Sequence, residues 1–285
     1  MDAFLASEAL ALGVVTRHDL MAHHRRLLPN VHAAKGEAST LEDRIAAAWL
    51  WSRRAGVITG LAASALHGAL WVDPDIPIEM NHPHNKAPAG VIPRRDTLLP
   101  AEIVTHQQMR VTSVARTAFD LARRGPPAKA VAHLDSLGRA TEFKVDDVLA
   151  VVEDHRRVRG RRRVAGLLEL MDCGAQSPKE TWLRLALMES GFPRPQTQIP
   201  VIAADGYHRY YLDMGWEEFM VAVEYDGEQH RTDDDQYRGD ITRSEYLDGL
   251  GWRRIRVLAG HRKEDIARRV EQAGVPRGFP ISLPR

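Results

Sequence analysis

Three acidic residues lie in strand-like segments of the run from Tyr211 to Val257, and this run constrains the fold more than any other. It reads YLDMGWEEFMVAVEYDGEQH, continues through a polar helix-like segment and closes with GWRRIRV. Successive side chains of a strand point to opposite faces, so Glu224 and Asp226 are expected to share one face. A hairpin between the segments can bring Asp213 beside them.

Carboxylates gathered in this way repel one another unless a cation neutralises them. Hard oxygen ligands select Mg²⁺ or Mn²⁺, and these metals chiefly serve phosphoryl chemistry. We therefore expect Asp213 and Glu224 to hold the metal, with Asp226 assisting. Glu180 closes the capping box Ser177-x-x-Glu180, while restriction-like nucleases often place a glutamate on this helix to complete the metal shell, and the two interpretations remain open.

The segments around these acids follow a regular order. Ser177 to Leu187 is expected to be a helix with proline at its first turn, and Gly191-Phe192-Pro193 ends it. Three strands in a meander follow, over 197–203, 207–214 and 219–225. A polar helix over 232–250, a strand over 252–257 and a helix over 263–273 complete the order. Helix, three-strand meander, helix, strand, helix is the order of the restriction-endonuclease core, a helix-flanked α/β fold around a mixed sheet, and Trp252 is expected in its core.

The composition is that of a globular chain with two or more cores. The chain has 285 residues, of which 44% are hydrophobic and 27% charged, and its net charge is +1. No apolar run approaches the ~20 residues needed to span a bilayer, and the N-terminus lacks the basic start of a signal peptide. Cys173 is the only cysteine, which excludes an internal disulfide and favours the cytoplasm.

The chain is predicted to be an α+β protein in four parts. Residues 1–55 are expected to form short helices, with Thr16 to Asp19 opening one of them and residues 42–54 forming a longer one. Two short helices around Gly13-Val14-Val15 fit a helix-turn-helix, although many helical hairpins also have this pattern. Residues 56–155 form a small α/β region, 156–175 a basic helical linker and 176–285 the C-terminal domain.

Two segments of the front half carry a family resemblance. They are GLAASALHG from Gly60 and VTSVARTAFDLAR from Val111. Together with the helices before them, they resemble AbiEi antitoxin-like proteins over residues 5–140. The resemblance implies an N-terminal winged helix, a mixed α/β domain and a toxin or regulatory partner. The matching residues are mostly small and apolar, so we expect them to pack, and no catalytic group is carried over.

Residues 175–275 resemble the Vsr-like endonucleases, a branch of the PD-(D/E)xK superfamily. The resemblance is carried by Asp213, Glu224 to His230, Asp240, Arg243, Leu247 and Gly251-Trp252. Asp226 stands where the superfamily has lysine, as in the Vsr-like branch. The resemblance implies that Arg243 reaches phosphate or braces a site carboxylate. His230 could act as general base, contact phosphate or simply be a surface residue, and Gln229 could orient the attacking water.

The densest basic run of the chain precedes this domain. It could form a stripe that binds nucleic-acid phosphates, or it could be a solvated helix start. Its arginines are Arg156, Arg157, Arg159, Arg161, Arg162 and Arg163. If the run is only solvated, the nucleic-acid contacts would lie in the winged-helix region, at Arg17, His23, His24, Arg25 and Arg26.

The predicted function is metal-dependent hydrolysis of nucleic-acid phosphodiester bonds, with DNA favoured over RNA as the substrate. In this interpretation the metal lowers the pKa of a bound water and stabilises the developing oxyanion. The alternative is a catalytically inactive, DNA-binding regulator of the antitoxin type. An enzyme that acts on nucleotides or RNA is a third possibility.

Overall fold

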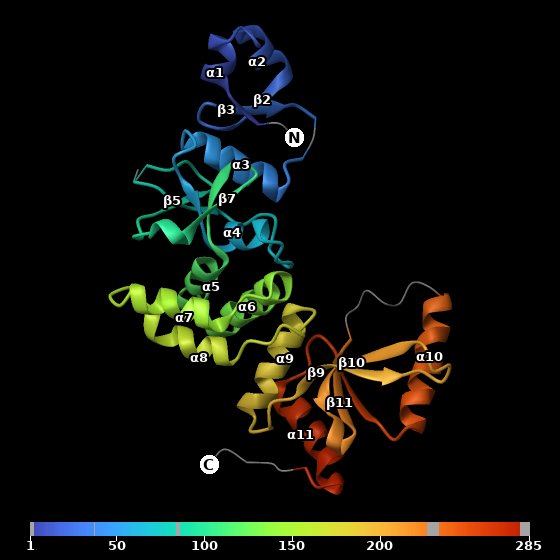
Figure 1. Cartoon of the computed structure of the whole chain (residues 1–285). Coiled ribbons are helices and arrows are strands. Elements are labelled where there is room, and N and C mark those ends of the chain that lie inside the picture. Colours follow the sequence, from blue (N-terminus) through green and yellow to red (C-terminus); the bar gives the residue numbers. More distant parts are fainter. Residues whose placement is uncertain (1–2, 37, 84–85, 227–233, 280–285) are drawn as a thin grey trace. The chain divides into compact units, whose positions relative to one another are not determined.

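The computed structural model describes residues 3–36, 38–83, 86–226 and 234–279 (Figure 1). The chain divides into two compact units, residues 1–169 and 170–285, which are described separately. Helices accompany three mixed or antiparallel sheets, so the predicted α+β fold class is confirmed. No helix among the described residues is long and apolar enough to cross a membrane.

The first sheet belongs to a small helix-turn-helix with a hairpin. Its strands are β1 (Phe4–Leu5), β2 (His24–Leu28) and β3 (Val31–Ala34), in the order β1-β3-β2, and all neighbours are antiparallel. Its helices are α1 (Ala6–Ala11) and α2 (Arg17–His23). The residue pattern predicted only helices here, whereas the winged-helix resemblance implied a wing, and the β2–β3 hairpin lies where that wing is expected. The segment His24-Arg25-Arg26-Leu27-Leu28 lacks an alternating pattern, and it is placed by packing on other elements.

Helix α3 (Leu41–Trp51) connects this sheet to the next one. The side chain of Thr40 caps it together with that of Asp43, as its capping-box sequence allows. Ala47 and Leu50 pack against Leu5 and Val31 of the first sheet. The neighbouring buried positions of α3 pack against the second sheet. One short helix therefore contributes to two small cores.

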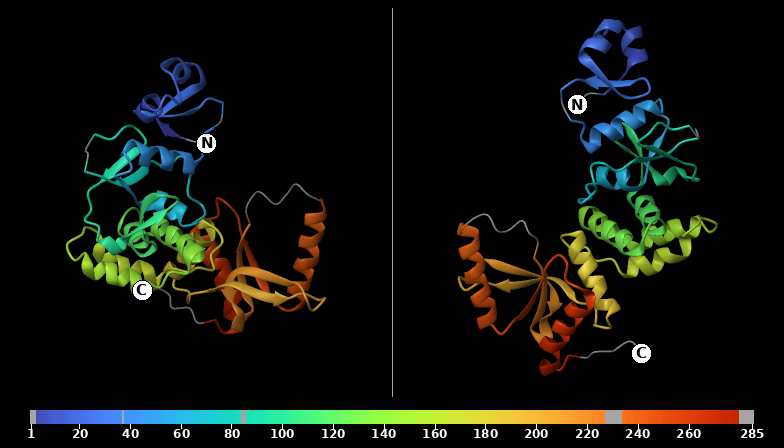
Figure 2. Two further views of the ribbon diagram at one scale, coloured as in Figure 1. Left: turned by 45° about the horizontal axis from the view of Figure 1, so that its top comes forward. Right: turned by 180° about the vertical axis from the view of Figure 1, so that it is seen from behind.

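The second sheet has five strands in the order β6-β5-β4-β8-β7, and it mixes parallel and antiparallel pairs (Figure 2). The strands are β4 (Val57–Ile58), β5 (Ile78–Asn81), β6 (Val91–Arg94), β7 (Ile103–His106) and β8 (Met109–Thr112). The helices of this region are α4 (Gly60–Leu66), α5 (Val114–Arg123), α6 (Pro127–Thr141), α7 (Val145–Asp154) and α8 (Val164–Glu169). Helices α5 to α8 pack on one another around buried Phe119, Leu134 and Val164.

The second unit has the predicted order of elements. They are α9 (Pro178–Glu189), β9 (Gln196–Ile202), β10 (Arg209–Trp216), β11 (Val221–Tyr225), α10 (Asp234–Gly249), β12 (Arg253–Val257) and α11 (Lys263–Gly274). The sheet order is β12-β11-β10-β9, antiparallel except between β11 and β12. Each predicted element therefore exists, with ends shifted by at most two residues where the described part of the chain shows them.

This four-stranded sheet is covered on both faces. One face packs on α9 and α11 through residues such as Leu183, Val223 and Ile266. The other face packs on α10 through Leu247, and Trp252 is buried in the same cluster, as predicted. The strands of this sheet are therefore close to helices on either side, and the acids of β10 and β11 lie within the domain rather than on an open surface.

Candidate functional site

Hydrogen bonds hold helix α2 at both of its ends. Thr16 and Asp19 form a reciprocal capping box at the start, with N–O distances of 3.1 and 2.8 Å. At the other end, Lys35 Nζ donates to the carbonyls of Met21 and Ala22 at 2.7 and 3.0 Å. These bonds satisfy backbone groups that a helix of seven residues would otherwise leave to water, so they fix α2 beside the hairpin.

The fixed helix presents polar and charged side chains to solvent. No residue of α2 is buried. The exposed cationic or titratable side chains of the region are Arg17, His18, His23 and Arg26. Glu8 is engaged in an ion pair with Arg54 at 2.6 Å, and Asp19 is engaged in the cap. The charge of Glu8 is therefore compensated, Asp19 keeps its charge within the cap, and Arg17, Arg26 and Lys35 outnumber it on the surface.

Such a helix-turn-helix with a hairpin is an arrangement that places one helix in the major groove of DNA. Of the residues considered as alternative nucleic-acid contacts, Arg17, His23 and Arg26 are exposed, and His24 and Arg25 are half-buried. His24 Nδ1 lies 3.0 Å from the carbonyl of Asp19, and Arg25 donates to Ser39 at 2.7 Å. The first three therefore remain available for a ligand, whereas the other two brace the motif.

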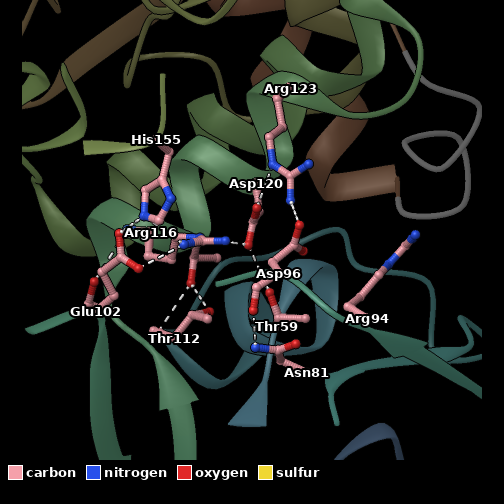
Figure 3. Close-up of polar contacts among 12 residues, drawn as sticks. Thr59, Asn81, Arg94, Asp96, Glu102, Thr112, Arg116, Asp120, Arg123 and His155 are labelled. Carbon is pink, nitrogen blue, oxygen red and sulfur yellow. Dashed lines mark hydrogen bonds and ion pairs between the residues drawn. The ribbon is translucent and has the colours of Figure 1, made fainter. Parts of the chain in front are cut away.

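A buried polar network follows in the α/β region, and the sequence analysis missed it. Figure 3 shows Arg116 at its centre. This side chain has no exposed surface, and it donates to Glu102 at 2.7 Å and to Asp120 at 3.2 Å. His155 Nε2 lies 2.6 Å from Glu102 Oε1 and 3.1 Å from Arg116 Nη1. Thr59 donates to Asp120 at 3.0 Å. The network thus ties the sheet to helices α5 and α7.

Further arginines extend the network toward the surface. Arg123 donates to Asp120 at 2.7 Å and pairs with Asp96 at 2.8 Å, while Arg124 pairs with Glu79 at 3.1 Å (Figure 3 shows the first two). Burial raises the pKa of Asp120, but the charges of Arg124, Arg116 and Arg123 outweigh burial and hold that pKa below its usual value. Asp120 is thus a buried anion that depends on its arginine neighbours.

A local signal for this network was present in the sequence. Arg116 and Asp120 are four residues apart on α5, the spacing at which side chains of a helix meet. The segment was instead interpreted as packing because most of its residues are small and apolar. Glu102 and His155 come from outside the segment, and no local pattern connects them to it.

The predicted basic run lies in turns rather than in a helix. Only the short 3₁₀ turn Arg161–Arg163 is regular structure, and α8 begins after it. The exposed members are Arg156, Arg157, Arg159 and Arg162, and the half-buried ones are Arg161 and Arg163. Arg161 donates to Glu153 at 2.6 Å and to the Val152 carbonyl at 2.8 Å. Part of the run therefore serves the turn itself, and phosphate binding by the run stays a prediction.

The structure brings three of the predicted acids near one another. Asp213 on β10 accepts a hydrogen bond of 2.9 Å from the Tyr225 amide of β11. Burial, followed by the charges of Glu180 and Glu224, raises the pKa of Asp213 to about 7. Ser177 Oγ accepts from the Glu180 amide at 3.1 Å, but the Glu180 carboxylate accepts from the Gln176 amide at 2.8 Å and not from Ser177, so only the Ser177 half of the predicted capping box forms.

The described residues do not fit a metal centre. No three His, Cys, Asp or Glu side chains of the described chain, including Asp213, Glu224 and Asp226, are grouped so that they could hold one ion. Arginines occupy the position expected for the cation, because Arg243 donates to Glu224 at 2.6 Å and Arg254 lies 3.7 Å from the same carboxylate.

The remaining predicted residues are placed as follows. Asp226 follows β11, and its amide donates to the Val257 carbonyl at 2.9 Å. Arg243, for which phosphate binding and carboxylate bracing were both considered, braces Glu224 and also donates to the Tyr211 carbonyl at 2.8 Å. Gln229 and His230 lie outside the described residues. Activation of a water by these two residues therefore stays a prediction.

Residues 54–170 match the family model of the AbiEi antitoxin C-terminal domain. The match spans β4 to α8, and it ends where the second unit begins. Two relatives are uncharacterized proteins of Mycobacterium tuberculosis, from strains CDC 1551 / Oshkosh and H37Rv. Each is 29% identical over 147 residues, which are 52% of this chain and 54% of the relative. The chain thus spans about half the length of the curated relatives it matches. No solved structure matches it.

These comparisons correct the predicted function. The match to an antitoxin domain agrees with the alternative and contradicts the metal-dependent endonuclease. Nothing in the comparisons supports the resemblance of residues 175–275 to Vsr-like endonucleases. The predicted function rested on assigning a metal to clustered acids, and the structure places arginine side chains beside one of them, Glu224.

Proposed function

We propose that the chain is a DNA-binding regulator of the antitoxin type. The observation that carries this proposal is the antitoxin-domain match over residues 54–170, which directly follows a helix-turn-helix with a hairpin wing. Regulators with such a motif bind operator DNA through one helix, and charged side chains on the wing contact the phosphate backbone. In this chain, α2 would enter the major groove and β2 would contact the adjacent backbone.

The side chains available for these contacts are consistent with this arrangement. Arg17 at the start of α2 and Arg26 on β2 are exposed, and neither forms an ion pair among the described residues. His18 and His23 are also exposed on α2 and can donate to phosphate or to base edges. Lys35 and the Thr16 cap hold the helix in place, so the contacts would be made by a preorganised element.

The test compares two duplexes of equal length, one taken from upstream of the chain's own gene and one of random sequence. Fluorescence anisotropy should show tighter binding to the upstream duplex. The variant R17Q/R26Q should lose about tenfold or more of that affinity, since it removes two charge-assisted contacts. The control R209Q/R262Q removes the same charge from exposed positions of the second unit and should bind normally.

Two outcomes would refute the proposal. One is equal affinity of the native chain for the two duplexes. The other is a preference for the upstream duplex that survives R17Q/R26Q unchanged, since the helix-turn-helix would then not be the reading element.

The antitoxin match also supports a toxin partner for residues 54–170. We expect expression of that toxin to arrest growth, and co-expression of the native chain to restore it. A genomic library selected for genes that are toxic only without this chain provides the measurement. Growth that is restored equally by the native chain and by a chain carrying D120A would argue against a role for this domain, because D120A should strongly destabilise it.

A further inference from the structure

A basic concavity lies in the second unit, away from the antitoxin-like domain in sequence. Its volume is about 600 Å³, and five of its eight lining residues are arginines. The lining arginines are Arg253, Arg254, Arg256, Arg269 and Arg277, and Asp248 is the only acidic residue among those that line it. They come from β12, α11 and the short turn Val275–Arg277. Like charges brought together in this way repel unless an anion joins them.

Arg254 is partly compensated within the unit, because its Nη1 atom lies 3.7 Å from the Glu224 carboxylate. Its side chain is only 6% exposed, and its Nε and Nη1 atoms form no hydrogen bond within the described structure. Its Nη2 atom is engaged with Asp248 at 3.2 Å and with Ser244. Buried donors without acceptors are costly, and a native structure normally satisfies them. Both donor atoms are themselves buried, so a ligand in the concavity would meet the charge of Arg254 and not these donors.

Two further arginines are held in position by neutral groups. Arg269 donates to the Arg256 carbonyl at 2.9 Å, and Arg277 donates to the Phe219 carbonyl at 3.1 Å. A carbonyl fixes a guanidinium without cancelling its charge. These two side chains are therefore oriented and still cationic, which suits recognition of an anion with several oxygens.

Arg253 and Arg256 complete the lining from β12, the edge strand of the sheet. Both are exposed. Charged residues on an edge strand can have the sole role of preventing that strand from pairing with another sheet. That explanation covers these two residues, but it does not cover the anchored Arg269 and Arg277.

We infer that this concavity binds the phosphate backbone of DNA. The inference rests on the proposed function for the identity of the polyanion. The guanidinium fork matches phosphate oxygens in two-point contacts. Several arginines lining one concavity suit a polymer that presents phosphates at regular spacing. The second unit would thus add backbone contacts to those of the helix-turn-helix.

The experiment uses the full chain and a short random-sequence duplex, with anisotropy measured across a range of salt. R253Q/R256Q should weaken binding about tenfold near physiological salt and lower the slope of log Kd against log salt by about 2, because about two counterions fewer are released. R209Q/R262Q, with the same charge change outside the concavity, should keep the native slope. R253K/R256K should keep most of the slope and bind less tightly than the native chain.

Several outcomes overturn the inference. They include an unchanged slope in R253Q/R256Q, an equal loss in R209Q/R262Q, and absence of duplex binding by the native chain. Competition by poly-glutamate as effective as that by DNA of equal charge would assign the concavity to an acidic protein. If the double variant aggregates, the single variants R253Q and R256Q test the inference instead. Each should change the slope of log Kd against log salt by about 1. If the native chain binds both duplexes equally but R253Q/R256Q still lowers affinity and salt slope as expected, only the proposed function is refuted.

Discussion

Asp213 shows at the scale of a single residue how charge and burial act on stability. Its pKa is raised to about 7 by burial and by Glu180 and Glu224. Between the ordinary value near 4 and this folded value, the unfolded chain loses the proton first. Stability therefore falls as pH rises through that interval, and the full penalty is present above it.

D213N should remove this penalty, because an asparagine stays neutral and its side-chain oxygen can still accept from the Tyr225 amide. We expect the melting temperature of the second unit to exceed that of the native chain at pH 8, with a difference that shrinks toward pH 4. E218Q, an exposed site with the same charge change, should leave the pH dependence as it is. Thermal melts at several pH values measure both variants. A decrease in melting temperature of the same size at every pH in D213N would contradict the raised pKa of Asp213.

At the scale of elements, helix α5 depends on the charges it buries. Removing one partner of a buried ion pair leaves the others uncompensated. D120A would remove the carboxylate that Arg116 and Arg123 share. It should therefore lower the free energy of unfolding of the first unit by about 3–5 kcal/mol. Urea denaturation measures this. D147A, at an exposed position of α7, should cost less than about 1 kcal/mol, and a D120A value as small as that would count against the network.

Helix α2 depends instead on its cap. The Thr16 hydroxyl accepts from the Asp19 amide at 3.1 Å, and T16A removes that acceptor. Hydrogen exchange of the α2 amides should accelerate about fivefold, since the cap no longer opposes fraying. T16S keeps the oxygen and should exchange at the native rate. Native-like exchange in T16A would mean that the hairpin alone holds the helix.

At the scale of the whole molecule, the two units have separate cores. We therefore expect two unfolding transitions in differential scanning calorimetry. D120A should move only the transition of the first unit, and D213N only that of the second, because the two sites belong to different cores. A single transition that both variants shift would show that the units unfold together.

The second unit was also the part whose elements could be predicted best. Alternation around Val223, the turn at Asp205-Gly206 and the proline at the start of α9 are local signals, and each produced its element. The β2–β3 hairpin lacked such a signal, and the residue pattern did not predict it. Trp252 was placed correctly in the core because its size and apolar character decide its position wherever the strand packs.

Charge compensation was decided only by the tertiary structure. The spacing of Asp213 and Glu224 in the sequence predicted that these acids lie close together. The arginines that neutralise Glu224 come from α10 and β12, and the sequence did not predict them. Likewise, Arg116 meets Glu102 and His155 only after folding. A sequence pattern records which side chains share a face of one element. It does not record which distant cation or anion lies opposite, and that partner determines whether an acid holds a metal or an arginine.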